Sequence, residues 1–250
     1  MAVHVDVAEE APFEVRSRTM ATPHILALEL VPGGPRIDFR PGQYVLLCDA
    51  QHRMPERSYS IANAPRADGS LRLLITRVPA GEISGWAHDE LRTGRGVLIS
   101  GPYGTFVRSA GAAAPELHLA AGSGLAPILA LLEEGLRHAA PAHSTTLLFS
   151  ARIEADVLMR DLLDRWQREH PNFTFLRTLT REIAPGLSGR IPTVLPMLFT
   201  DLSRHSVFIA GSDGFVESCR QAVLALGANR SRVLAEEFFF EPHHWRVLSS

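Results

Sequence analysis

The pattern of apolar residues and turn formers changes near residue 108, and this change limits the chain to two structurally different halves. Before it, short runs of β-forming residues are separated by turn formers such as PGQ (41–43) and NAPRADG (63–69). After it, apolar strand-like runs alternate with amphipathic segments of helical length. Short strands between turns are typical of an antiparallel barrel, whereas strand–helix alternation indicates a parallel sheet with helices on both faces.

The first half is expected to contain six strands and one helix. The β-like runs are FEVRSR (13–18), HILALELV (24–31), YVLLC (44–48), RSYSIA (57–62), LRLLITRV (71–78) and GVLISG (96–101). The helix is expected over 84–92, with Ser84 as its N-cap because a serine hydroxyl can accept from the first free N–H groups. We therefore predict a six-stranded antiparallel β-barrel over residues 1–107.

The second half is expected to form a doubly wound α/β domain. Its strand-like runs are LHLAA (117–121), TLLFS (146–150), FTFLRTL (173–179), VFIAG (207–211) and RVLAEEFFF (232–240). Helical segments follow at 126–138, 156–169 and 215–227. This order predicts a parallel five-stranded sheet with helices on both faces over residues 108–250.

Composition excludes several classes of function. The formal net charge of −2 gives no basic excess for nucleic-acid binding, and no apolar run reaches the ~18 residues that span a bilayer. The first residues show no secretory signal pattern, so a cytoplasmic location is expected. Two cysteines, Cys48 and Cys219, are too few for an iron–sulfur cluster in this chain, and no ligand spacing indicates a metal site.

Two segments of the barrel half could bind a phosphorylated aromatic ligand. In the run Arg57–Ser60, RSYS, an arginine offers a fork of donors for phosphate, and Tyr59 lies on the same face of a strand and offers a ring for stacking. In the run Gly81–Ser84, GEIS, a turn opens the only helix of this half, and free N–H groups at a helix start suit a phosphate. Taken alone, an exposed Arg–Tyr pair and a plain helix cap explain these residues equally well.

Two loops of the second half are candidates for dinucleotide binding. The turn AAGSGLAP (120–127) follows the first strand, where glycines let the backbone approach a pyrophosphate and Pro127 suits the first helical turn. The loop AGSDGF (210–215) follows the fourth strand, and the ends of these two strands lie close together in a doubly wound sheet. An ordinary strand–helix turn, capped by Ser212 or Asp213, is the alternative for the second loop.

In this order the segments resemble those of the ferredoxin–NADP reductase superfamily, and most of all the reductase components of bacterial multicomponent oxygenases. The similar segments are PGQYV (41–45), RSYS (57–60), GEIS (81–84), GPYGTF (101–106), AAGSGLAP (120–127) and AGSDGFVES (210–218). They extend over roughly residues 12–240. The resemblance implies a flavoprotein with bound FAD, or less readily FMN, and with NADH or NADPH as its electron donor.

The resemblance also implies a role for individual residues. Arg57, with Ser58 beside it, would bind the flavin phosphate, Tyr59 would stack on the isoalloxazine and Ser60 would hydrogen-bond near flavin N5. Phe238 resembles the C-terminal aromatic residue that lies near the flavin. The remaining cofactor contacts it implies are Thr76, Val78, Gly81, Ile83 and Ser84 for the flavin, and Gly122, Ser123, Gly124, Pro127, Arg152, Gly211, Ser212, Asp213 and Phe215 for the nicotinamide dinucleotide.

The chain departs from the family pattern at three points. Many members have a cysteine where this chain has Ala210, and the usual Pro and Met of that loop are Asp213 and Phe215 here. These changes predict an altered nicotinamide contact and a slower hydride transfer. The fused iron–sulfur domain of most oxygenase reductases is also absent from this sequence.

Three functions remain open at this point. The first is an NAD(P)H-dependent reductase that passes electrons from FAD to a separate ferredoxin or oxygenase component, with Arg36, Arg40, Arg53 and Arg57 as possible docking residues. The second is a reductase of free flavin, and the third is a nucleotide-binding regulatory subunit without activity. Analogy with oxygenase reductases slightly favours NADH, and Arg152, where a 2′-phosphate could lie, does not decide it.

Overall fold

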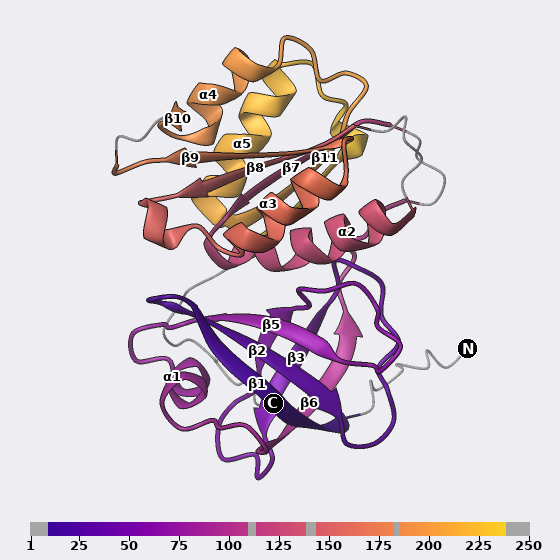
Figure 1. The fold of residues 1–250 in the computed structure, drawn as a ribbon, viewed down its shortest axis with the longest axis vertical. Coiled ribbons are helices and arrows are strands. Elements are labelled where there is room, and N and C mark those ends of the chain that lie inside the picture. Colours follow the sequence, from indigo (N-terminus) through magenta and orange to yellow (C-terminus); the bar gives the residue numbers. More distant parts are fainter. Residues whose placement is uncertain (1–9, 110–113, 139–143, 183–185, 239–250) are drawn as a thin grey trace, which may run out of the picture.

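The computed structural model describes residues 10–109, 114–138, 144–182 and 186–238, which form two stacked lobes (Figure 1). The first lobe is built from one antiparallel sheet and the helix α1 (Glu82–Asp89). Its strands are β1 (Glu10–Thr22), β2 (Ile25–Pro32), β3 (Tyr44–Asp49), β4 (Arg57–Ser60), β5 (Leu71–Thr76) and β6 (Gly96–Tyr103). All six lie at the predicted runs.

The antiparallel sheet closes on itself as a barrel. Its strand order is β4-β3-β6-β1-β2-β5, so β4 and β5 are the two edges. The residue after β4, Ile61, makes a bridge with Leu73 of β5, and the N–H of Ala62 donates to the carbonyl oxygen of Arg72 at 2.8 Å. This joins the two edges, and the barrel encloses a core of alternate inward-facing residues such as Val15, Leu28 and Leu47.

The second lobe contains a parallel sheet in the order β10-β9-β8-β7-β11-β12. Its strands are β7 (Glu116–Ala121), β8 (Thr145–Ala151), β9 (Phe173–Leu179), β10 (Leu187–Ser188), β11 (Ser206–Ser212) and β12 (Val233–Phe238). The helices are α2 (Leu125–His138), α3 (Arg160–Glu169), α4 (Ile191–Leu198) and α5 (Asp213–Ala225). One apolar cluster joins α2 and α3 to one face, and another joins α4 and α5 to the other. The doubly wound architecture is therefore confirmed.

Some details differ from the expectation. The parallel sheet has six strands rather than five, because the two-residue strand β10 adds an edge beside β9. Helix α3 begins at Arg160 rather than near 156, since Val157 is extended and Met159 has a left-handed backbone (φ +52°). Helix α1 begins two residues earlier than predicted, with Gly81 as its N-cap, so the assignment of Ser84 as N-cap is wrong. Helix α4 was not predicted.

The two lobes share one apolar cluster. Ile25, Ala62, Leu74 and Phe106, from the barrel half, belong to the same buried cluster as the residues of α2, which lies between the sheets (Figure 1). The connection between the sheets runs from Gly104 to Pro115, and a domain boundary at 107/108 within it remains our proposal. The relative placement of the two lobes is thus set by packing as well as by the chain.

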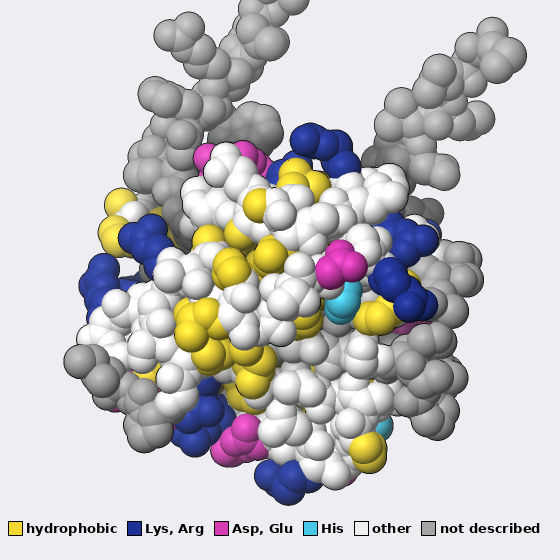
Figure 2. Space-filling view, turned by 90° about the horizontal axis from the view of Figure 1, so that it is seen from above, with side chains coloured by type: hydrophobic (Ala, Val, Ile, Leu, Met, Phe, Trp, Pro, Cys, Tyr) yellow, Lys and Arg dark blue, Asp and Glu magenta, His cyan; other side chains and the backbone are white. Residues whose placement is uncertain are grey.

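The described side chains at the far end of the α/β lobe do not gather into one charged patch (Figure 2). Seen from above, hydrophobic side chains gather towards the middle of this face, and basic side chains lie separately around its edges (Figure 2). Of the helices in the described residues, none has the length and apolar character to cross a bilayer.

Candidate functional site

The tetrapeptide at 57–60 forms strand β4, an edge of the barrel. It pairs with β3, which places Tyr59 opposite Val45 and Ser60 opposite Tyr44. Among the described residues, the half-buried Arg57 side chain makes one hydrogen bond, from Nη1 to the carbonyl oxygen of the preceding Glu56 at 3.0 Å. Most of its five N–H donors therefore remain free for an anion. Ser58 is exposed, and Tyr59 packs against the barrel core, where burial raises the pKa of its hydroxyl.

The turn before α1 is tighter than its sequence indicated. The Gly81 N–H donates to the carbonyl oxygen of Val78 at 3.0 Å, so Gly81 does not offer a free donor. The Ser84 hydroxyl donates to the Gly81 carbonyl oxygen and accepts from the Val78 N–H, both at 3.2 Å. The N–H groups of Ile83 and Ser84 lie in the first helical turn, which leaves them without an intrahelical acceptor. These two amides are the donors that could meet a phosphate.

The glycine-rich turn after β7 forms a single 3-10 turn, Gly122–Gly124, that leads directly into α2. Gly122 has a left-handed backbone (φ +55°), which glycine adopts without strain. At Gly124 a Cβ atom would lie 2.3 Å from the carbonyl oxygen of Ala210, so no other residue fits there. Pro127 lies buried in the first turn of α2. The turn thus presents free N–H groups and touches the end of β11.

The loop after β11 lies beside that turn because β7 and β11 are neighbours, with Ala120 opposite Ala210. Gly211 and Ser212 end β11, and Asp213 begins α5, without a side-chain cap from Ser212. The Phe215 ring packs on Gly211, where a Cβ would lie 2.6 Å from its Cδ1 atom. Phe215 therefore covers the backbone of this loop. A side chain at position 211 would clash with its ring.

Strand β12 brings a residue to the site that sequence reasoning missed. The hydroxyl of Ser60 donates to Glu236 Oε1 at 3.1 Å, across the boundary between the lobes. Burial raises the pKa of Glu236 to about 7, although the Ser60 hydrogen bond acts to lower it. Its Oε2 atom is buried and has no partner among the described residues. The sequence did offer one indication of Glu236: it lies two residues before Phe238, so both side chains are on the same face of the strand.

Phe238 ends β12 half-buried, opposite Ser212 in the strand register. Residues beyond it lie outside the described part of the chain. Its position brings the predicted aromatic residue to the carboxyl edge of the sheet, where the loops at 122–124 and 211–213 also lie. The C-terminal aromatic and these two loops are thus brought to one edge.

A second hydrogen bond connects the barrel to the glycine-rich turn after β7. Thr76, at the end of β5, donates through Oγ1 to Ser123 Oγ at 2.9 Å. On α2, Glu133 accepts from the Ala64 N–H at 3.0 Å, and Arg137 donates to the Pro65 carbonyl oxygen at 3.1 Å. These bonds hold the turn at 122–124 against the barrel edge.

The carboxyl ends of β8 and β9 carry basic residues. Arg152 follows β8 and makes an ion pair with Asp156 at 2.8 Å. The N–H of Arg181 donates to the Arg152 carbonyl oxygen, so the two backbones run side by side. The exposed Arg181 side chain makes no hydrogen bond or ion pair within the described ranges. Glu182, the next residue, accepts from the Glu154 N–H at 2.7 Å, so this edge also carries a carboxylate beside the Arg181 guanidinium.

These features fit FAD and a nicotinamide dinucleotide. Arg57 offers a largely free guanidinium, α1 offers first-turn amides, and the turn at 122–124 offers N–H groups beside a backbone approach that only glycine allows. The unpartnered Oε2 of Glu236 marks a buried polar position beside Ser60. Both groups of donors lie near the end of β5, since Thr76 bonds Ser123 and Val78 bonds Ser84.

Comparison with known proteins gives the family. The Oxidoreductase FAD-binding domain matches residues 14–107 and the Oxidoreductase NAD-binding domain matches residues 119–221. The chain is 35% identical to Ferredoxin--NADP reductase B of Sorangium cellulosum, over 80% of this chain and 85% of that protein. It is 30% identical to reductase component 1 of terephthalate 1,2-dioxygenase from Comamonas, over 92% of this chain and 68% of that protein.

Solved structures agree with this assignment. A cytochrome P450 reductase from Amycolatopsis superposes with a TM-score of 0.85 at 26% identity, covering 92% of this chain and 70% of the other. The matched domains bind FAD and NAD, and relatives of this kind are reductases. The chain therefore belongs to the ferredoxin–NADP reductase superfamily, as a flavoprotein reductase that binds FAD and takes electrons from NAD(P)H.

Proposed function

We propose that the protein passes electrons from NAD(P)H through bound FAD to a separate redox protein, a ferredoxin or an oxygenase component. The observation that carries this proposal is the Ser60–Glu236 hydrogen bond of 3.1 Å. It joins the flavin tetrapeptide to the sheet that holds the nucleotide loops, so the two cofactors would meet at this point. The relatives' names, a ferredoxin reductase and an oxygenase component, support the class of acceptor.

Each half of the site has a separate task. Arg57 and the first amides of α1 would bind the flavin phosphates, and Tyr59 would orient the ring by stacking. The turn at 122–124 would hold the pyrophosphate of the dinucleotide, and Phe238 would cover the flavin until nicotinamide replaces it. Packing of α2 against the barrel would exclude water from the space between them.

When bound, FAD accepts a hydride from NAD(P)H and releases its electrons one at a time. The protein supplies orientation and electrostatics to this step. Ser60 would hold the flavin edge, and Glu236, with its pKa near 7, would take or release the accompanying proton through the Ser60 hydroxyl. Neither residue needs to form a covalent bond.

Anaerobic reduction tests the proposal directly. The purified protein should be yellow, should bleach on addition of NADPH or NADH, and should regain colour when oxidised ferredoxin or cytochrome c is supplied. A protein that bleaches but transfers electrons only to added riboflavin or FMN would instead be a reductase of free flavin. A yellow protein that does not bleach would be a regulatory subunit.

The docking surface for an acidic partner can be tested in the same assay. Arg36, Arg40 and Arg57 have no carboxylate partner in the described parts of the chain, whereas Arg53 pairs with the buried Asp49 at 3.1 Å. If these arginines steer an acidic ferredoxin, its reduction rate should fall steeply as salt rises from low ionic strength. A rate that does not change with salt would remove this surface from the proposal.

We also propose that NADPH is the preferred donor, which reverses the slight preference for NADH that analogy gave. With the pyrophosphate on the turn at 122–124, the adenosine half would extend over the ends of β8 and β9. There Arg152 is neutralised by Asp156, but Arg181 beside it has no counter-ion among the described residues. A 2′-phosphate would supply that missing negative charge.

Steady-state kinetics with both donors test this preference. We expect kcat/KM to be higher for NADPH, and the substitution Arg181→Gln to lower the NADPH/NADH ratio by about tenfold to a hundredfold, since a hydrogen bond to a charged group contributes roughly 1.5–3 kcal/mol. Arg168→Gln, at the far end of α3, is the matched control. An unchanged ratio in Arg181→Gln would contradict the proposal while leaving the reductase function intact.

A further inference from the structure

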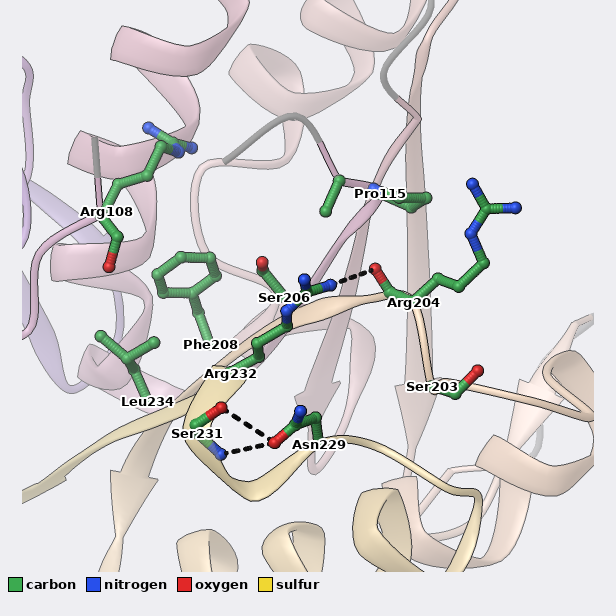
Figure 3. A pocket seen from close by; sticks show the side chains of 12 residues that line it. Arg108, Pro115, Ser203, Arg204, Ser206, Phe208, Asn229, Ser231, Arg232 and Leu234 are labelled. Atoms are coloured by element: carbon green, nitrogen blue, oxygen red, sulfur yellow. Dashed lines mark hydrogen bonds between the residues drawn. The ribbon is translucent and has the colours of Figure 1, made fainter. Parts of the chain in front are cut away.

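A cavity lies at the end of the parallel sheet opposite the nucleotide loops (Figure 3). Its lining includes Pro115, just before β7, Ser206, the first residue of β11, and Leu234, near the start of β12. Its volume is about 730 Å³. This is within the range of small-molecule sites, and nothing in the reductase function uses it.

The lining of this cavity is positively charged. Three of its residues are arginines and none is acidic. Arg108 is committed to Glu116 through two bonds of 2.6 and 2.7 Å. Arg204 and Arg232 have no carboxylate partner in the part of the chain that the structure describes; Arg232 only donates to the Arg204 carbonyl oxygen, at a long 3.4 Å. The cavity therefore attracts anions.

Asp201 is close to these arginines in sequence but does not line the cavity. It lies on the turn before Arg204, but its two oxygens accept from the N–H and the hydroxyl of Ser203, at 2.8 and 2.9 Å. Among the described residues it makes no ion pair with Arg204 or Arg232. The Asp201 carboxylate is thus directed towards Ser203 on the same turn.

A buried hydroxyl points to a ligand independently of the charge. Ser206 is only 9% exposed, yet its Oγ atom has no protein partner within the described ranges. Its side chain lines the same cavity as the Arg232 guanidinium (Figure 3). This Oγ is not one of the fully buried polar atoms, so it is accessible from the cavity and can donate to a ligand there.

The remaining wall is apolar and rigid. Phe208, 1% exposed, is stacked on the buried His118 with ring centroids 4.9 Å apart and meets Phe106 edge-on at 5.9 Å. Leu234 lies beside it on β12 and is half-buried. A ligand here would meet donors on one side and hydrocarbon on the other.

We propose that this cavity binds an organic anion of metabolite size, a carboxylate or a phosphate ester, with Arg232 and Ser206 as donors to its oxygens and Leu234 against its apolar part. Two guanidinium groups without counter-ions disfavour a cation, and the apolar wall favours an organic anion over an inorganic one. The inference is independent of the electron acceptor and donor proposed above.

Calorimetric titration of the FAD-loaded protein tests the site. Saturating NADP⁺ is present throughout, so that the nucleotide turn cannot take up the probes. Benzoate is the organic anion, inorganic phosphate the anion without an apolar part, and benzamidine the matching cation. We expect saturable binding of benzoate, weaker binding of phosphate and none of benzamidine.

Variants assign that binding to the cavity. Arg232→Gln should weaken benzoate binding about tenfold or more, and Ser206→Ala by a smaller factor. Arg168→Gln, outside the cavity, should bind as the wild type does, and an unchanged flavin content in each variant shows that the fold is intact. Absence of saturable benzoate binding, equal binding of benzamidine, or an unaltered affinity in Arg232→Gln would each overturn the proposal.

Discussion

Glu236 is a buried residue of the site that ionises near neutral pH. Burial raises its pKa to about 7, from an ordinary value of 4.5. The folded protein therefore holds a proton there that the unfolded chain loses between these values, and this contribution to stability is present at low pH and lost as pH rises towards 7. A shift of this size corresponds to on the order of 3 kcal/mol.

We expect Glu236→Gln to remove that dependence. The free energy of unfolding of the variant should vary less between about pH 5 and pH 8 than that of the wild type. The pH profile of kcat/KM for NADPH should also lose its inflection near 7, because glutamine keeps the Ser60 hydrogen bond but cannot titrate. Chemical unfolding and steady-state rates across this range measure both. An inflection that survives in the variant would assign the proton to another group.

At Gly124 the space for a side chain is already taken. A methyl group would lie 2.3 Å from the carbonyl oxygen of Ala210, so Gly124→Ala must push the two nucleotide loops apart. We expect NADP⁺ binding to weaken by about tenfold or more while the FAD content stays unchanged. Gly96→Ala, which meets only ordinary contacts in the barrel, is the control. Difference spectra on titration with NADP⁺ measure the affinity, and wild-type affinity in Gly124→Ala would contradict the expected clash.

Among the elements, the turn between β3 and β4 depends on one buried carboxylate. Asp49 accepts from the N–H groups of Gln51, Arg53 and Met54. Burial acts to raise the pKa of Asp49, but these bonds and the Arg53 side chain lower it overall. The stability it gives is therefore present at neutral pH and lost as pH falls below the ordinary range of a carboxyl group. This turn sets the start of β4 and so the position of Arg57.

Asp49→Asn should loosen that turn. An amide would place N–H donors against the N–H groups that the carboxylate now accepts from, at a cost of about 1–3 kcal/mol. Thermal unfolding should show the loss, and dialysis should remove FAD from the variant more readily. The exposed Asp38→Asn is the control and should leave both unchanged. Full flavin retention by an equally destabilised Asp49→Asn would separate the turn from the cofactor.

Sequence patterns identified nearly every long element, and their failures have physical causes. The six barrel strands and five of the parallel strands carry clear apolar runs between turns. Helix α4 was missed because Pro192 and Pro196 lie within eight residues, and prolines usually mark a break. Strand β10 is too short for any periodicity. Ser84 looked like a cap, but its hydroxyl bonds the Val78 turn instead.

Only those parts of the candidate site that lie within a short sequence motif could be predicted. The glycine turn at 122–124 and the tetrapeptide on β4 stand out as local patterns. The contact of Ser60 with Glu236 joins residues 176 positions apart, and no local rule indicates it. Its recognition needed the fold, because the pKa of Glu236 depends on burial between the lobes.

For the whole molecule, Arg108 lies in the connection between the two sheets and bonds to both lobes. Its carbonyl oxygen accepts from Arg40 of the barrel half at 3.0 Å, and its guanidinium grips Glu116 of β7. Burial acts to raise the pKa of Glu116, yet Arg108 and His118 bring it down to about 2. The stability from this pair is present above the ordinary pKa of a glutamate and is lost as pH falls towards 2.

Arg108→Gln should leave Glu116 buried without its cation. We expect a loss of about 3 kcal/mol at neutral pH, which shrinks on acidification as Glu116 becomes protonated in the variant. Hydride transfer measured by stopped flow should slow, because the linker no longer fixes one lobe on the other. Arg95→Gln, on an exposed barrel turn, is the control. A loss that is constant from pH 7 to pH 3 would mean that the charge of Glu116 is not its source.

The apolar cluster shared by α2 and the barrel extends across residue 108, where the sequence pattern changes. The two halves of the sequence therefore do not correspond to two separate hydrophobic cores. A gene cut at residue 108 would leave Ile25, Ala62, Leu74 and Phe106 facing water. The isolated barrel should therefore aggregate and be poorly soluble, whatever its affinity for flavin. Anyone exchanging nucleotide modules between reductases of this kind should therefore change these four barrel residues together with the incoming module, because α2 cannot be separated from β7 and the turn at 122–124.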